Sequence, residues 1–303
     1  MSNPNKRREV IKQLAFGAGL LTVTGMVASC ETKPKEQEEE EPAAPVQVGL
    51  RGNVNHSTCR WCYNSIPLEE FLKGAADIGL KGIDLLTPQE WPVAKKYGLE
   101  CSMGTDTFAN IEHGFNDPAN HAELQEKYME LISKAAKAGV KNVICFSGNQ
   151  RELDDETGIE NCVTGLKPLI EHAEKEGVIV FMELLNSKVN HPDYQCDTTP
   201  WGVALSEKLG SPNFKLLYDI YHMQIMEGDV IATIKKYHKH IGHYHTGGVP
   251  GRNEINETQE LYYPAIIRAI LDTGFKGYIA QEFVPTYDDK LAALKEGIMI
   301  CDV

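Results

Sequence analysis

The sequence predicts an α/β protein built on a (β/α)8 barrel, in which eight parallel strands are each followed by a helix. Three observations support this fold class. From residue 46 onward, short apolar segments alternate eight times with segments of helical periodicity. Glycine follows most of the helical segments, as is common where helices end. Three segments, DIGLKGIDLL, KAGVKNVICF and DTGFKGYIAQE, repeat one order of helix end, glycine turn and buried strand.

The chain of 303 residues is long enough for one barrel and an N-terminal extension. Strands are expected at residues 46–50, 81–86, 99–104, 142–146, 178–183, 213–219, 241–245 and 278–282. Helices are expected at residues 67–78, 88–97, 118–138, 159–176, 198–209, 231–238, 262–272 and 288–298. A doubly wound open sheet is the alternative, but no GxGxxG motif follows the first predicted strand.

Residues 1–30 have the pattern of an export signal. Lys6-Arg7-Arg8 precedes an apolar run over residues 14–28, which is too short for a comfortable membrane span. The segment RREVIK resembles a twin-arginine signal, and VASC resembles a lipobox in which Cys30 becomes the lipidated first residue. The sequence therefore predicts an exported protein, either periplasmic or tethered to the outer membrane as a lipoprotein. A lone transmembrane anchor is the alternative.

Residues 31–45, ETKPKEQEEEEPAAP, are expected to form a flexible acidic linker that precedes the barrel domain at residues 46–303. The linker carries charge and proline but almost no apolar side chains, so it lacks the means to build a core. The whole chain has a formal net charge of −13, which argues against nucleic acid as a partner. Contact with a membrane is expected only through the N-terminal anchor.

The cysteines do not predict a disulfide scaffold. Seven of the 8 cysteines follow Cys30, an odd number without regular spacing. Cys59 and Cys62 have CxxC spacing, but no second CxxC or paired histidine motif accompanies them. A structural role is favoured for this pair over a zinc or redox site.

Four of the predicted strands end in residues that bind metal ions. These are Glu183 after VIVFM, Asp219 after FKLLY, His245 after IGHY and Glu282 after GYIAQ. In a (β/α)8 barrel the carboxyl ends of all strands meet at one rim. A carboxylate at the end of a buried strand needs a cation or hydrogen bonds to offset its desolvation. Three carboxylates and one imidazole suit Mn²⁺, Mg²⁺ or Co²⁺ better than a structural zinc ion.

Beyond residue 45, the chain resembles the hydroxypyruvate isomerase group of the xylose isomerase-like barrels, which also includes the tagatose and psicose 3-epimerases. The resemblance covers nearly the whole barrel domain. It is carried by MELLNS at Glu183, LYDIYHMQ at Asp219, HYHTGGVPGRNE from His243, LYYPAII after Glu260 and AQEFVP at Glu282. Together these motifs are specific to the superfamily but less specific to a substrate.

The resemblance implies a metal-dependent isomerase with one divalent ion, Mn²⁺ or Mg²⁺, with Co²⁺ also suitable. Its ligands would be Glu183, Asp219, His245 and Glu282. The substrate would be an α-hydroxy carbonyl compound, such as hydroxypyruvate and tartronate semialdehyde or a keto-sugar. Its isomers would interconvert through a cis-enediolate whose charge the metal stabilises. Glu183 and Glu282 would pass the proton, while Asp219 and His245 would fix the ion.

Three further residues are candidates for contact with the substrate. His222 follows the strand that ends at Asp219, where the family also carries a histidine; a core histidine is the alternative. Arg252 matches a family arginine that can clamp a substrate oxygen or carboxylate, with a plain surface arginine as the alternative. His56, near the end of the first strand, and Trp61 are placed on the opposite side of the pocket.

Several other functions compete with the isomerase. Ketose epimerases carry histidine at the position of His245, where the isomerases often carry glutamine, so a ketose 3-epimerase is the first alternative. A nuclease of the endonuclease IV kind needs more rim histidines and a basic surface, whereas this chain has 10 histidines and a charge of −13. A non-catalytic carbohydrate-binding barrel has no reason to keep both Glu183 and Glu282. Barrels of this group often pair, which implies a homodimer.

Overall fold

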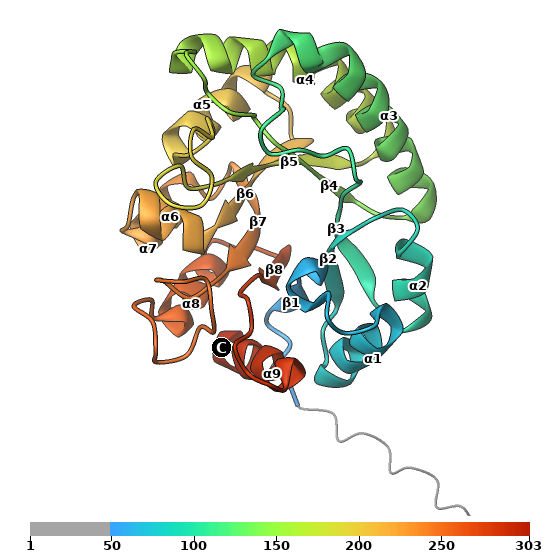
Figure 1. Ribbon diagram of the computed structural model, residues 1–303, viewed down its shortest axis with the longest axis vertical. Helices are drawn as coiled ribbons and strands as arrows, with labels where there is room; N and C mark the ends of the chain where they lie inside the picture. The colour runs from blue at the N-terminus through green and yellow to red at the C-terminus, as the bar shows by residue number, and fades with distance from the viewer. Residues whose placement is uncertain (1–48) are drawn as a thin grey trace, which may run out of the picture. The chain divides into compact units, whose positions relative to one another are not determined.

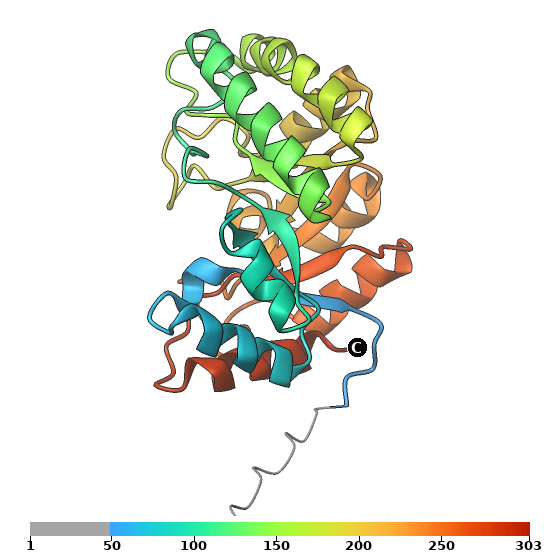
Figure 2. The same cartoon turned by 90° about the vertical axis from the view of Figure 1, so that its right-hand side faces the viewer.

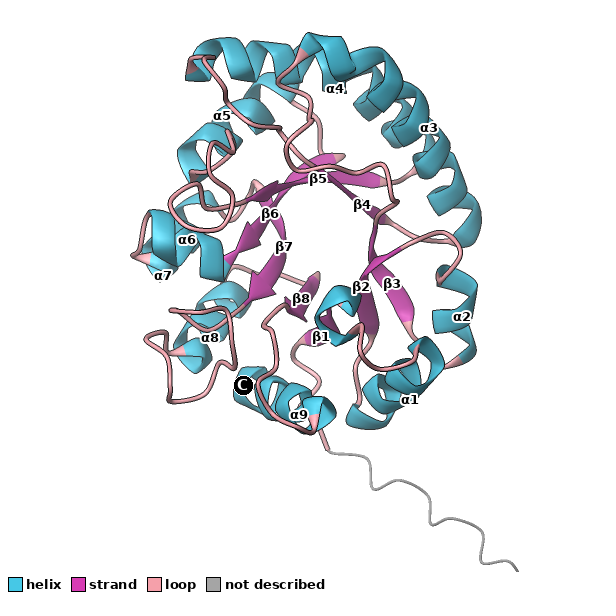
Figure 3. Ribbon diagram, viewed as in Figure 1, coloured by secondary structure: helices cyan, strands magenta, loops and turns pink. Residues whose placement is uncertain are grey.

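The computed structural model describes residues 49–303, which form a barrel of eight parallel strands (Figure 1). The sheet order is β1-β8-β7-β6-β5-β4-β3-β2, and a parallel bridge between Cys59 and Asp84 brings the two ends of the sheet together. Figure 3 shows these strands as an inner ring surrounded by helices. The strands are β1 (Asn55–Thr58), β2 (Gly82–Leu86), β3 (Glu100–Gly104), β4 (Asn142–Cys145), β5 (Ile179–Leu184), β6 (Phe214–Asp219), β7 (Ile241–Thr246) and β8 (Tyr278–Gln281). The predicted (β/α)8 fold is confirmed.

The helices pack on the outside of the ring, as the view turned by 90° in Figure 2 also shows. They are α1 (Leu68–Ile78), α2 (Trp91–Lys96), α3 (His121–Ala138), α4 (Asp155–Glu176), α5 (Thr199–Leu209), α6 (Ile220–Met226), α7 (Val230–Tyr237), α8 (Tyr263–Asp272) and α9 (Lys290–Cys301), with the 3-10 helices η1 (Arg60–Tyr63) and η2 (Pro118–Asn120). Gly79 ends α1 with φ 102° and Gly139 ends α3 with φ 83°, a left-handed conformation that glycine adopts without steric cost. Glycines therefore predicted correctly where these helices end.

The burial of β6 shows why the apolar runs predicted strands so well. Phe214, Leu216, Leu217 and Tyr218 are completely buried, because a parallel barrel strand has packed side chains on both faces. At the end of this strand, Asp219 stands opposite His245 of β7 in the sheet register. The register therefore brings two polar side chains together at the carboxyl end of the barrel.

The first strand lies later in the sequence than predicted. It was expected at 46–50, but residues 49–50 are not in a strand, residues 46–48 lie outside the described part of the chain, and β1 begins at Asn55. Ser57 and Thr58 are buried all the same, because they have polar partners: the Ser57 hydroxyl lies 2.5 Å from a carboxylate oxygen of Asp84, and the Thr58 hydroxyl donates to the backbone carbonyl of Gln281. A search for apolar runs cannot find a strand whose burial depends on hydrogen bonds.

Helix α6 was also not expected. It begins directly after β6, and the carboxylate of Asp219 accepts hydrogen bonds from the backbone N–H groups of Tyr221 and His222, at 2.8 and 3.3 Å. Asp219 is therefore the N-cap of this helix, a position that favours aspartate. The cap turns the chain so that His222 lies directly beside the end of β6.

The other seven predicted strands and all eight predicted helices overlap observed elements. The predicted export signal with Cys30, and the predicted linker at residues 31–45, lie outside the described residues. Over residues 49–303, no helix is both long enough and apolar enough to span a membrane.

Candidate metal centre

Four side chains converge at the carboxyl ends of the last four strands. Each offers one possible ligand atom, and these atoms all lie within 4.8 Å of one another. The four are Glu183 of β5, Asp219 of β6, His245 of β7 and Glu282 directly after β8, and all are buried. Adjacent parallel strands in register bring their ends to one place, so the cluster follows directly from the barrel topology.

The imidazole of His245 lies at the middle of this cluster. Its Nδ1 atom is 2.6 Å from Oε2 of Glu282 and 3.2 Å from Oε1 of Glu183. The nearby guanidinium of Arg252 can balance at most one of the three carboxylates. Three hard oxygen donors with one nitrogen are the donor set that fits a divalent cation of the Mn²⁺ or Mg²⁺ type.

The environment shifts the pKa values of the three carboxyl groups apart. Burial raises the pKa of Glu183 and raises that of Asp219 to about 7. Burial also opposes ionisation of Glu282, but Arg252 and His245 outweigh it and hold the pKa of this group well below its ordinary value. One buried carboxylate is thus strongly held in its charged form, while two neighbours favour the neutral form.

In the metal-free protein, ionisation of the buried Asp219 destabilises the fold, and we expect the Asp219→Asn variant to lack this destabilisation. Burial raises the pKa of Asp219 from 3.8 to about 7, so its stabilising neutral form is fully present below pH 3.8 and is lost as the pH rises towards 7. The difference in unfolding free energy between the variant and wild type should therefore grow by about 2 kcal/mol as the pH rises from about 5.5 to about 8. Chemical denaturation in the presence of EDTA measures this difference, and a difference that stays constant over the range contradicts the assignment.

Arg252 lies directly against the cluster. Its Nη2 atom is 2.9 Å from Oδ2 of Asp219 and 2.5 Å from Oε2 of Glu282. The guanidinium is flanked by the rings of Trp61 and Tyr221, at 5.5 and 5.2 Å from their centroids. The backbone of Arg252 is in the left-handed region, with φ 59°, so the loop after β7 bends sharply to deliver this side chain.

His222 is completely buried on the other side of Arg252. Its Nε2 atom is 3.0 Å from Nη1 of Arg252, and its Nδ1 atom accepts a hydrogen bond of 3.1 Å from the backbone N–H of Asn186. Burial and the charge of Arg252 hold the pKa of His222 well below its ordinary value. The structure thus brings His222 and Arg252 to the metal-ligand cluster, and their contact with a substrate stays a prediction.

His56 does not join this group. It lies within β1, where successive side chains point to opposite faces, and its neighbour Ser57 points into the barrel towards Asp84. The imidazole of His56 instead lies 3.5 Å from Asp302, which follows α9. His56 is therefore on the wrong face of β1 for the substrate contact that was predicted.

Two residues contact the cluster more directly than the sequence predicted. Trp61, in η1, donates a hydrogen bond of 2.7 Å from its indole nitrogen to Oε1 of Glu282, and its side chain is partly exposed. Asp84, in the middle of β2, is completely buried and lies 3.1 Å from Nε2 of His245. A charged residue inside the apolar run GIDLL was a signal for Asp84 of the same kind as the one that identified Asp219.

Comparisons with known proteins agree with this architecture. The family model described as xylose isomerase-like TIM barrel matches residues 72–300. The 2-oxo-tetronate isomerase of Cupriavidus necator is 35% identical over 233 residues, which cover 72% of this chain and 87% of the relative. The hydroxypyruvate isomerase of Escherichia coli is 25% identical over 222 residues, covering 70% of this chain and 85% of the relative.

Among solved structures, the D-psicose 3-epimerase of Clostridium cellulolyticum superposes with a TM-score of 0.66 at 19% identity, covering 82% of this chain and 100% of the epimerase. At this identity the likeness concerns the fold. The family model, by contrast, spans residues 72–300 of the barrel just described, from α1 to α9. The chain therefore belongs to the xylose isomerase-like TIM barrel family.

Proposed function

We propose that the protein is a metal-dependent isomerase of small α-hydroxy carbonyl compounds, acting by proton transfer through a cis-enediolate. One observation carries this proposal: Glu183 and Glu282 both approach Nδ1 of His245, yet their pKa values are shifted in opposite directions. Pairs of neighbouring groups whose environments separate their pKa values are typical of acid–base catalysis. Relatives named hydroxypyruvate isomerase and 2-oxo-tetronate isomerase support the same reaction class.

Glu282 and Glu183 divide the work of moving the proton in this proposal. Glu282, whose charged form is favoured, takes the proton from the carbon next to the carbonyl group. Glu183, whose neutral form is favoured, donates its own proton to the neighbouring carbon. Transfer of the proton from Glu282 to Glu183 then restores both groups for the next turnover. Both carboxylates are buried, so the proton is kept from exchanging freely with bulk water.

Asp219 and His245 complete the ligand set for the divalent ion. When bound, the ion supplies positive charge that stabilises the enediolate. Arg252 and His222 bind substrate oxygens, because the guanidinium fork and the imidazole lie together beside the cluster, 3.0 Å apart. The rings of Trp61 and Tyr221 hold the guanidinium in place from two sides.

A ketose 3-epimerase is the second candidate, and His245 favours it, because this family's epimerases carry histidine as a ligand there. An epimerase protonates the carbon that lost its proton, with inverted configuration. An isomerase protonates the neighbouring carbon. Incubation of the Mn²⁺-loaded protein with hydroxypyruvate, a 2-oxo-tetronate and a set of ketohexoses, followed by NMR, distinguishes them. An epimerised ketose identifies the second activity, and the absence of any turnover across the panel contradicts both.

We also propose that the protein is exported and anchored by a lipid on Cys30. The support is the sequence pattern of residues 1–30 described above. The Cys30→Ala variant, expressed from the full chain, should move from the membrane fraction to the soluble fraction, as measured by immunoblotting. Its matched control is Cys62→Ala, which should stay with the membrane. Membrane association that persists in Cys30→Ala contradicts lipidation at this residue.

A further inference from the structure

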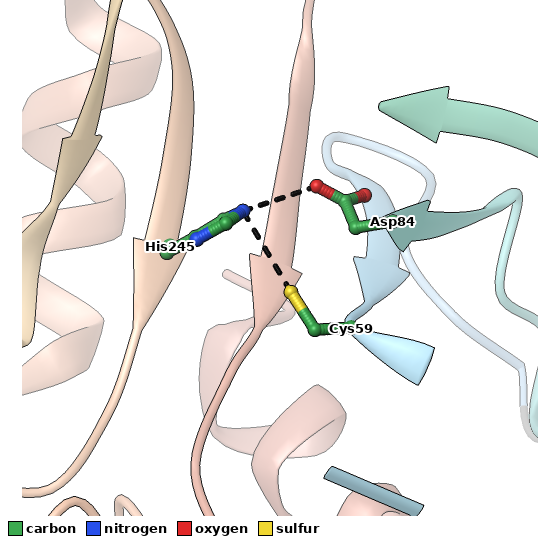
Figure 4. Close-up of side chains that lie close together, drawn as sticks. All are labelled: Cys59, Asp84 and His245. Carbon is green, nitrogen blue, oxygen red and sulfur yellow. Dashed lines mark hydrogen bonds and ion pairs between the residues drawn. The ribbon is translucent and has the colours of Figure 1, made fainter. Parts of the chain in front are cut away.

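A second group of buried polar side chains lies beside the Nε2 atom of His245, on the edge of its imidazole that faces away from the metal-ligand cluster. Figure 4 shows three of its members, Cys59, Asp84 and His245. Nε2 of His245 is 3.1 Å from Oδ2 of Asp84 and 3.7 Å from Sγ of Cys59. Asp84 comes from β2 and His245 from β7, so this contact crosses the interior of the barrel.

Asp84 is surrounded by hydrogen-bond donors. Its Oδ1 atom accepts from the hydroxyls of Ser57 and Ser102, and its Oδ2 atom lies 2.5 Å from Nε2 of His243 as well as close to His245. Four donors on two oxygens are what an ionised carboxylate can satisfy, because this group only accepts hydrogen bonds.

This arrangement determines which nitrogen of His245 would keep its hydrogen when a cation binds the cluster. An acceptor-only carboxylate at 3.1 Å from Nε2 requires a hydrogen on Nε2. The Nδ1 atom, on the other edge of the imidazole, faces Glu183 and Glu282 at 3.2 and 2.6 Å. In the metal-free protein Nδ1 therefore also carries a hydrogen, which a cation bound among these carboxylates would displace, while Asp84 keeps the hydrogen on Nε2. Nδ1 is therefore the nitrogen that is directed at the metal-ligand cluster.

We propose that Asp84 is a positioning residue for the metal site, which holds His245 as the Nε2–H tautomer and so presents Nδ1 to the ion. The inference rests on the metal-dependent function proposed above. Histidine ligands in metalloproteins generally donate their second N–H to a carboxylate or carbonyl, which orients the ring and makes the ligand more basic. Here the carboxylate is delivered from the opposite side of the barrel, and Ser57, Ser102 and His243 hold it there.

Cys59 offers a competing arrangement, since Cys59, Asp84 and His245 also lie close enough together to ligate a metal. Two observations favour the positioning role. Cys59, Asp84 and His245 supply three ligand atoms, whereas the cluster at the ends of β5 to β8 supplies four, three of them carboxylates. Both oxygens of Asp84 already accept hydrogen bonds. A metal held by Cys59 and Asp84 would bind Nε2 of His245 rather than Nδ1, so the two arrangements predict hydrogen on different nitrogens of the metal-loaded protein.

The test compares Mn²⁺ binding by isothermal titration calorimetry in wild type, Asp84→Asn and the control Ser102→Ala. Asp84→Asn replaces the carboxylate with a neutral amide, whose oxygen is a weaker acceptor for the Nε2–H of His245, so we expect Mn²⁺ affinity to fall by about 10- to 100-fold. Ser102→Ala removes one donor to the same carboxylate and leaves the contact with His245, so its affinity should stay close to wild type. Unfolding temperatures in EDTA are measured in parallel, because a merely structural role of Asp84 would lower stability without changing Mn²⁺ affinity.

The outcomes separate this inference from the proposed function. A wild-type protein that does not bind Mn²⁺ contradicts the metal-dependent function itself. Wild-type affinity in a folded Asp84→Asn protein contradicts only the role of Asp84. Should Asp84→Asn not fold, NMR of wild type labelled with ¹⁵N-histidine and loaded with Mg²⁺ decides: hydrogen on Nε2 of His245 supports the proposal, whereas an Nδ1–H tautomer overturns it.

Discussion

Replacing Glu183 or Glu282 with glutamine will lower isomer turnover by about 10²- to 10⁴-fold, the range over which a positioned acid or base accelerates a reaction. Glutamine keeps the size and the hydrogen-bonding oxygen of the side chain but cannot gain or lose a proton. The Glu282 side chain accepts from Trp61 and Arg252, and an amide oxygen can keep one of these bonds. The two variants should therefore remain folded, which circular dichroism and thermal unfolding will check.

A matched control for these variants is Glu260→Gln. Glu260 is an exposed glutamate in the loop after β7, and it contacts Gln224 rather than the metal-ligand cluster. Its replacement should leave turnover unchanged. Full activity in both Glu183→Gln and Glu282→Gln would overturn the proposed acid–base roles, because neither side chain could then be moving the proton.

Removal of divalent ions will reduce turnover to background and will destabilise the fold. Without an ion, burial favours the neutral form of Glu183 and Asp219, and a bound cation is what would let these two ligands ionise at neutral pH. An ion present at about 100 times its dissociation constant adds about 2.7 kcal/mol to the free energy of unfolding. We therefore expect dialysis against EDTA to lower the unfolding temperature and Mn²⁺ to restore both stability and turnover.

The control for this experiment is Asp219→Asn, which removes one carboxylate from the ligand set. Its unfolding temperature should respond to Mn²⁺ much less than that of wild type. Metal content is followed by elemental analysis at each step. Unchanged turnover in protein that retains no divalent ion would contradict a metal-dependent mechanism.

The clustering of Glu183, Asp219, His245 and Glu282 could be predicted because topology alone brings strand ends together. In a parallel barrel, a residue at the carboxyl end of one strand is near the same position of the next, whatever the loops do. Each of the four followed an apolar run that was easy to recognise. Sequence periodicity therefore carried enough information to locate the rim of the barrel.

Residues whose role depends on contacts across the barrel could not be found in this way. Asp84 meets His245 from a strand on the other side of the ring, 161 positions away in sequence. His56 and Ser57 are adjacent in sequence, yet one faces Asp302 and the other faces Asp84. Because the first strand was predicted at 46–50, His56 and Ser57 were not recognised as neighbours within one strand. In a strand, successive side chains point to opposite faces, so only one of the two can point into the barrel.

The origin of the four ligand-cluster residues in β5 to β8 has an evolutionary consequence. The loops that follow β3 and β4 contribute none of these residues, and loops tolerate substitution and insertion better than the strands that they connect. Mutations in those loops can change which molecules enter the barrel while leaving the chemistry of the opposite half untouched. Natural selection can thus produce a new substrate range from this scaffold in small steps, without passing through an inactive ancestor.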